Sequence, residues 1–208
     1  MKHVMTNERN EMKTINETPA LRRPGTVVLA AISTNRAMVG ALALLLAGGL
    51  TALANDNRAP EVPDEIAVGD TNKVHFHGYA VGVQIYTWNG NVWGNAVPRA
   101  TLFDADGNVV IQHFGTPNGP GWRSNSGSEV VGKLPPKKVI VDRTAIPWLL
   151  LAAIPDLTHG PGILADTSFV HRVNTVGGLA PKEPGAFVGQ VAEVPYNADY
   201  FFYRTTNN

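Results

Sequence analysis

The chain has 208 residues, a formal net charge of zero and no cysteine. This length corresponds to one domain with a tail. The lack of cysteine excludes disulfides, cysteine-bound zinc, iron–sulfur clusters, a thiol nucleophile and the lipid anchor of bacterial lipoproteins. Residues 55–208 hold 11 basic and 14 acidic side chains without a basic stripe, which argues against a nucleic-acid partner. No sequence motif calls for a cofactor, so none is predicted.

Residues 1–54 have the pattern of an export signal. The apolar run 38–50 is 13 residues long, contains no charge and follows Arg36. A bilayer span needs about 20 residues, whereas this length suits the h-region of a signal peptide. Ala52-Leu53-Ala54 then supplies the small-x-small pattern that signal peptidase cleaves after. The alternative is an uncleaved membrane anchor.

This pattern predicts how the chain is organised and where it goes. Residues 1–54 are expected to form a signal peptide with an extended n-region, and residues 55–208 a single β-rich domain. After cleavage the domain would have no membrane span. We therefore expect an exported protein that is periplasmic or extracellular.

Residues 55–208 read as short strands separated by turns. Runs rich in Val, Ile, Phe, Tyr and Trp alternate with clusters of Gly, Pro, Asn and Asp, and no stretch keeps a helical period over three turns. The sequence predicts an all-β domain, an antiparallel β-sandwich or barrel of about nine to ten short strands. The expected strands are 73–77, 81–88, 100–103, 109–114, 129–133, 148–154, 168–174, 190–194 and 200–204.

Two turns and one alternating run refine this picture. Asn89-Gly90 and the segment 104–108, with Gly107, tolerate the positive φ angles of hairpin turns. Within residues 81–86, side chains alternate between the two faces of a strand. We expect the aliphatic face in the core and the other face away from it, with Val81, Val83 and Ile85 inward and Gln84 and Tyr86 outward.

Several segments, in order along the chain, carry a resemblance to a known family. They include Gly82-Val83-Gln84-Ile85-Tyr86, Ala100-Thr101-Leu102-Phe103-Asp104, Ile146-Pro147-Trp148-Leu149-Leu150, Arg172-Val173-Asn174-Thr175 and Val194-Pro195-Tyr196-Asn197-Ala198-Asp199-Tyr200. From about residue 60 to 204 the chain resembles the domain of unknown function 3455 family of exported bacterial and secreted fungal proteins. The resemblance implies an exported β-rich domain. It supplies no activity, because the family has none assigned.

The chain departs from this family where many members carry two cysteines. The first place is held here by Thr87 or Trp88, and the second falls in Glu183-Pro184-Gly185. The resemblance implies that both halves of a disulfide have been lost together. Such a bridge would then be dispensable and not catalytic.

Five polar or aromatic residues are the candidates for a ligand site. Aromatic rings stack on sugar faces, and arginine binds carboxylates through its two-pronged guanidinium. The pattern predicts a site for a carbohydrate or another small molecule, formed by His113, Trp122, Lys133, Arg172 and Asn174. The alternative is that the tryptophan is a core or rim aromatic and that Arg172 pairs with a carboxylate such as Asp199.

A metal site is a second candidate. His75-Phe76-His77 would place two imidazoles on one face of a strand, about 6–7 Å apart. A third ligand such as His113 or His171 would complete a histidine-rich zinc or copper site. The alternative is a solvated polar face without metal.

These observations favour one function and leave two alternatives. The favoured function is a non-enzymatic exported binding module for a sugar, a small carboxylate or an envelope component. The first alternative is an exported hydrolytic or metal-dependent enzyme, and the second is a structural or stress-related surface protein. A hydrolase elbow is not found, because Gly127-Ser128 lacks the flanking pattern.

Overall fold

The computed structural model describes residues 57–206, and all of them belong to one compact unit, Leu50–Asn208. This part of the chain is all-β, as predicted, with two short 3-10 turns and no α-helix. No helix within it could cross a membrane. The predicted signal peptide lies outside the described residues.

The elements are η1 (Asp64–Ile66), β1 (Asn72–Thr87), β2 (Val97–Phe103), β3 (Val109–Thr116), β4 (Gly119–Ser124), β5 (Glu129–Val131), β6 (Lys137–Val139), β7 (Trp148–Ala152), η2 (Pro155–Leu157), β8 (Thr167–Gly177) and β9 (Val191–Thr205).

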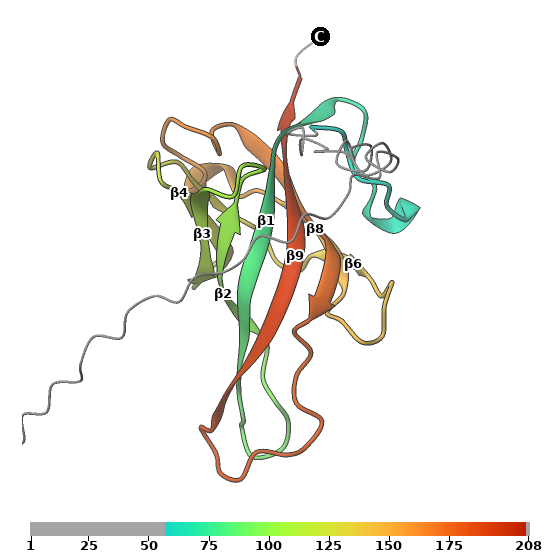
Figure 1. Cartoon of the computed structure of the whole chain (residues 1–208), viewed down its shortest axis with the longest axis vertical. Coiled ribbons are helices and arrows are strands. Elements are labelled where there is room, and N and C mark those ends of the chain that lie inside the picture. The colour runs from blue at the N-terminus through green and yellow to red at the C-terminus, as the bar shows by residue number, and fades with distance from the viewer. Residues whose placement is uncertain (1–56, 207–208) are drawn as a thin grey trace, which may run out of the picture. The chain divides into compact units, whose positions relative to one another are not determined.

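The nine strands form a single antiparallel sheet in the order β5-β4-β3-β2-β1-β9-β8-β7-β6. The sheet curls into a half-barrel (Figure 1). Of the two predicted architectures, the two-sheet sandwich is therefore excluded. Isolated backbone bridges join the β5 side of the sheet to the chain that follows β7, pairing Gly132 with Ala153 and Glu129 with His159. These bridges bring the two sides of the curl together.

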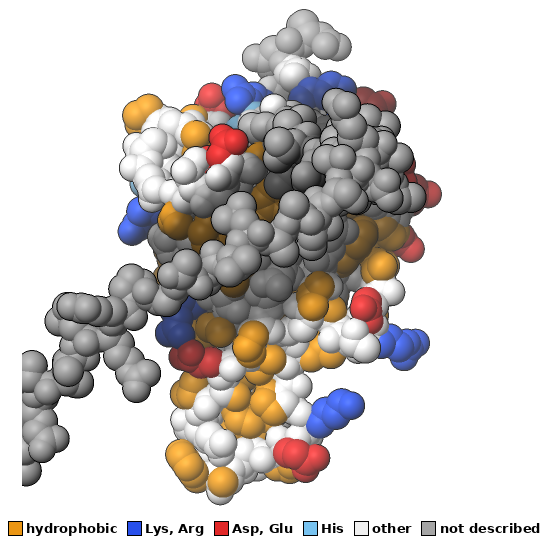
Figure 2. All heavy atoms as spheres, viewed as in Figure 1, with side chains coloured by type: hydrophobic (Ala, Val, Ile, Leu, Met, Phe, Trp, Pro, Cys, Tyr) orange, Lys and Arg blue, Asp and Glu red, His pale blue; other side chains and the backbone are white. Residues whose placement is uncertain are grey.

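The two central strands are much longer than the sequence predicts. Strands β1 and β9 contain 16 and 15 residues and pair from Asn72↔Thr205 to Thr87↔Val191. Each of them merges two strands that were expected to be separate. The loops that follow β1 and precede β9 lie at the same end of the molecule (Figure 1). Figure 2 shows hydrophobic side chains gathered on the surface of this end, where Phe187 and Val188 are exposed.

Strands β4 and β6 were not predicted, and composition explains the case of β4. Strand β4 reads Gly-Pro-Gly-Trp-Arg-Ser, and glycine and proline are depleted in strands, so the sequence carries no strand signal there. The two predicted turns are present. Trp88 and Trp93 bridge across Asn89-Gly90, with Gly90 at φ 98°, and Gly107 has φ 82° between β2 and β3.

The curled sheet has an inner and an outer core. The inner cluster includes Leu102, Trp122 and Phe202, and the outer cluster, around Phe201 and Tyr203, packs against the segment that contains Val62 and Val68. Alternation along β9 separates the two clusters, because neighbouring side chains point to opposite faces.

The predicted orientation of residues 81–86 is wrong. Val81 is 56% exposed, whereas Gln84 and Tyr86 are only 2% and 7% exposed. The alternation is present, but the polar and aromatic face points to the inside of the curl. The prediction assumed that the interior is filled by aliphatic side chains, and at this level the interior is instead a partly polar cavity lined by Gln84.

Candidate functional site

A cavity of about 540 Å³ lies inside the curled sheet. Its walls come from β1, β2, β3, β4, β7, β8 and β9, together with the segment 134–138. Cavities of this size hold small organic ligands in many proteins. The side chains that define its chemistry are Gln84, His113, Trp122, Lys138, Arg172 and Tyr200.

The structure brings three of the five predicted ligand residues together in this cavity. His113 is on β3, Trp122 on β4 and Arg172 on β8. Strands β3 and β9 are separated by two others in the sheet, yet the rings of His113 and Tyr200 lie 5.2 Å apart. Curling of the sheet therefore creates a site from strands that are not neighbours.

Trp122 cannot serve as an open stacking platform for a sugar. Its side chain is 1% exposed, and its ring stacks on His113 at 4.5 Å and 2°. Tyr200 and Phe202 pack edge-on against it at 5.7 and 5.9 Å. What Trp122 can offer a ligand is its indole N–H, because Nε1 has no hydrogen-bond partner.

Arg172 places a positive charge in the cavity wall. Its Nη2 donates to the Pro147 carbonyl over 2.9 Å, which fixes the guanidinium, while its buried Nε has no partner. None of the described residues that line the cavity is Asp or Glu, and Lys138 adds a second cation. The expected alternative pairing with Asp199 is not observed, because Asp199 accepts a hydrogen bond from Asn174 instead.

Unpartnered hydrogen-bond donors gather in this cavity. Among the described residues, four buried side-chain nitrogen or oxygen atoms have no partner, and three of them belong to cavity residues. We call these three the cavity donors: Gln84 Nε2, Trp122 Nε1 and Arg172 Nε. Buried polar groups are nearly always hydrogen-bonded in folded proteins, so a cluster of unpaired donors is an unusual feature. All three can donate only and all three atoms are buried, so an acceptor would satisfy them once a local movement of the wall lets it reach them.

The remaining polar groups of the wall are neutral. The hydroxyl of Tyr200, which lines the cavity, lies 3.3 Å from that of Tyr196, and burial raises the pKa of both phenols. His113 Nδ1 lies 2.8 Å from the Gly121 carbonyl. Burial lowers the pKa of His113 to about 3, with a smaller contribution from the Arg172 charge. The cavity thus combines two positive charges, Arg172 and Lys138, with uncharged aromatic and amide groups.

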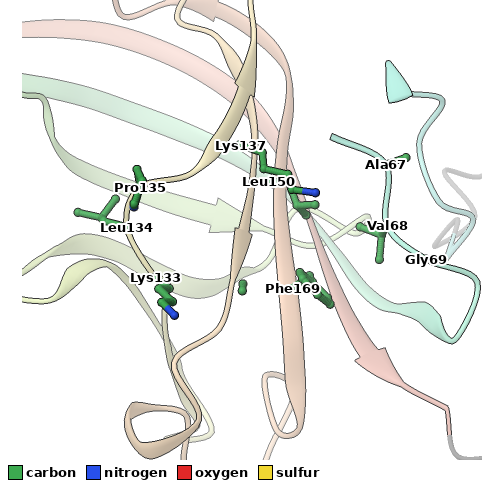
Figure 3. Close-up of a pocket in the computed structure, with 10 residues that line it drawn as sticks. Ala67, Val68, Gly69, Lys133, Leu134, Pro135, Lys137, Leu150 and Phe169 are labelled. Atoms are coloured by element: carbon green, nitrogen blue, oxygen red, sulfur yellow. The ribbon is translucent and has the colours of Figure 1, made fainter. Parts of the chain in front are cut away.

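The other two predicted ligand residues lie outside the cavity. Lys133 lines a separate groove of about 360 Å³ on the outer side of the sheet. Figure 3 shows Leu150 and Phe169 between Lys133 and Val68 in this groove. Asn174 is exposed, has φ 51° in a bulge of β8, and donates to Asp199 over 2.7 Å.

The predicted histidine metal site does not form within residues 57–206, where no three His, Asp or Glu side chains are grouped to hold a metal. A β-bulge between Val74 and Phe76 breaks the alternation, and His75 Nε2 bonds Thr167. His77 stacks on Phe201, on the face opposite to His113. His171 shares the face of His77, but Tyr203 and the Ile66 carbonyl occupy both of its ring nitrogens.

Gln84, Lys138 and Tyr200 are the site residues that the sequence analysis missed. Gln84 was assigned to the outer face, and Tyr200 was read only as part of a strand. A signal for Gln84 exists in the sequence: it is the one amide in the aliphatic, aromatic and glycine stretch 78–86. Tyr200 offers no such signal, because tyrosine is common in strands.

Comparison with known proteins places the chain by family alone. No curated protein and no solved structure matches it. The family model described as "Protein of unknown function (DUF3455)" matches residues 69–204, most of the chain. This agrees with the resemblance seen in the sequence, and the protein belongs to the DUF3455 family.

Proposed function

We propose that this protein is a non-enzymatic binding module whose interior cavity holds a small organic anion, with a carboxylate as the charged group. The observation that carries the proposal is Arg172 in the wall of this cavity, a cation without a carboxylate partner, together with two further unpaired donors in the same wall, Gln84 Nε2 and Trp122 Nε1. Guanidinium and carboxylate pair through charge-assisted hydrogen bonds, the stronger class of such bonds.

The cavity also supports the choice of an anion over a neutral sugar. The Trp122 ring is covered by His113, so stacking on a sugar face is not available. The cations Arg172 and Lys138 face the same space, and no described lining residue carries a negative charge. A paired carboxylate set of the glycosidase type is therefore not supplied by this wall.

Substitution of Arg172 tests the proposal. We expect small carboxylates to raise the unfolding temperature of the wild-type protein, because a ligand at a hundred times its Kd adds about 2.7 kcal/mol of stability. Arg172→Met should abolish this shift, and Arg172→Lys should retain part of it through the remaining charge. The matched control is Arg143→Met at an exposed position. An unchanged shift in Arg172→Met would refute the assignment.

The proposal also includes export of the protein, which the sequence pattern of residues 1–54 supports. In this view the module works in the periplasm or outside the cell. Cleavage after Ala54 makes Asn55 the first residue of the released protein. Intact mass of the protein recovered from the culture would show this directly, and a chain that keeps residues 1–54 would count against export by a cleaved signal.

A further inference from the structure

The cavity contains an acceptor beside its donors. The 2.8 Å distance from His113 Nδ1 to the Gly121 carbonyl requires a proton on Nδ1, because a carbonyl oxygen can only accept. The ring is kept neutral because full burial lowers the pKa of His113 to about 3. In this tautomer Nε2 carries a lone pair and no proton. His113 therefore presents an acceptor, whereas Gln84, Trp122 and Arg172 present unpaired donors.

The acceptor and the donors lie close enough to bind one small molecule. His113 and Trp122 stack in parallel with their ring centroids 4.5 Å apart. Tyr200 packs edge-on against both rings, and its pairing partner on β8 is Arg172. A ligand whose charged group reaches Arg172 therefore has its body beside the His113–Trp122 stack.

From this arrangement we infer that the ligand is a hydroxy acid, in which the carboxylate meets Arg172 and the cavity donors while a hydroxyl group donates to His113 Nε2. The inference rests on the proposed anion-binding function and narrows its ligand class. A simple carboxylate would satisfy the donors but leave the imidazole acceptor unpaired. A neutral sugar would satisfy the imidazole but leave the arginine without a counter-charge. A molecule that carries both groups can supply a counter-charge to Arg172 and a donor to His113 at the same time.

Three probes of similar ring size separate these cases in calorimetric titrations of the purified protein. D-glucuronate carries a carboxylate and hydroxyls, cyclohexanecarboxylate carries only the carboxylate, and D-glucose carries only hydroxyls. We expect glucuronate to bind about two- to tenfold more tightly than either analogue, the range that one net hydrogen bond contributes.

His113→Asn is the matched variant, because the asparagine amide can still donate toward the Gly121 carbonyl while the Nε2 acceptor is lost. It should reduce glucuronate affinity to that of cyclohexanecarboxylate and leave the latter unchanged. Should this variant fail to fold, nitrogen NMR of wild-type protein with labelled histidine gives the same information. A shift of the His113 Nε2 signal with glucuronate, absent with cyclohexanecarboxylate, is the expected result, and no shift contradicts the inference.

The outcomes of these titrations distinguish the hydroxy-acid inference from the anion-binding function on which it rests. Equal binding of glucuronate and cyclohexanecarboxylate would overturn the hydroxy-acid inference and leave the anion-binding proposal standing. Equal binding of glucose and glucuronate would overturn the requirement for an anion, and with it both statements. Binding of neither acid would also overturn both.

Discussion

Gln84 illustrates how one residue can lower stability in favour of binding. Its side chain is 2% exposed, and its Nε2 has no hydrogen-bond partner. Leaving a buried donor unpaired costs about 1–3 kcal/mol, whereas an apolar side chain of similar shape avoids that cost. Groups that are poorly satisfied in the free protein yet grouped around a cavity are typical of binding sites, where function opposes maximal stability.

Gln84→Met should therefore stabilise the ligand-free protein. We expect the free energy of unfolding to rise by about 1–2 kcal/mol in urea titrations, because the unpaired amide is removed while the side-chain volume is kept. Carboxylate affinity should fall in the same variant. Gln112→Met, on the exposed face of β3, is the control and should change stability little. A Gln84→Met protein less stable than the control would mean that the amide is satisfied without ligand.

At this scale the sequence predicts part of the site. His113, Trp122 and Arg172 could be selected because aromatic rings and arginine side chains are groups that bind sugars and carboxylates. Their meeting could not be predicted, because it depends on the curl of the sheet. Lys133 and Asn174 were selected by the same chemical reasoning, but the register of β8 and the path after β5 direct them outward.

At the scale of elements, the segments 87–88 and 183–185 show why the chain does without cysteine. Trp88 packs directly on Gly185, where an added Cβ would lie 2.7 Å from the Trp88 Cβ. Trp93 packs edge-on against Trp88 at 5.4 Å, and its Nε1 donates to the Glu183 carbonyl over 2.9 Å. An aromatic contact thus joins the two loops at the places where the family resemblance implies a disulfide.

A disulfide should be possible at this contact. In Trp88→Cys/Gly185→Cys the two Cβ atoms would start somewhat closer than the 3.5–4.5 Å that a disulfide needs, and loss of the indole makes room for adjustment. We expect the oxidised variant to lose both thiol hydrogens in its intact mass. It should exceed its own reduced form in stability by about 2–4 kcal/mol. Trp88→Cys alone is the control, and thiols that stay titratable in the oxidised double variant would contradict the expectation.

Strand identity was largely predictable and strand extent was not. Hydrophobic runs identified seven of the nine strands, two of them as separate pieces. A bulge and glycines interrupt β1, and the polar residues Asn197 and Asp199 interrupt the apolar run of β9, without ending their pairing. Strand β4 stayed hidden because pairing with β3, and not intrinsic propensity, holds Gly119–Ser124 in extended form. The prediction of which face of residues 81–86 points inward was wrong for another reason, because alternation alone does not say which face is inside.

At the scale of the whole molecule, the curl of one sheet has two consequences. It buries a continuous inner core without a second sheet, and it encloses a cavity with polar walls inside that core. Histidines are buried on both faces of the curled sheet. His113 is on the inner side and His171 is under the segment around Ile66, and burial lowers the pKa of each. The stability of the fold should therefore depend on pH.

The direction of this pH dependence follows from comparing how many protons the folded and the unfolded states bind. Below pH 6.5 the unfolded chain binds protons at these histidines, while the folded chain holds His113 neutral down to a pKa of about 3. The free energy of unfolding therefore has its highest value above pH 6.5 and falls as pH decreases, by about 1.4 kcal/mol per pH unit for each such histidine.

Urea titrations between pH 7 and 4 measure the slope of the free energy of unfolding against pH. His113→Asn should reduce it by about that amount, with the exposed His159→Asn as control. Equal slopes in both variants would mean that His113 takes up its proton in the folded protein too.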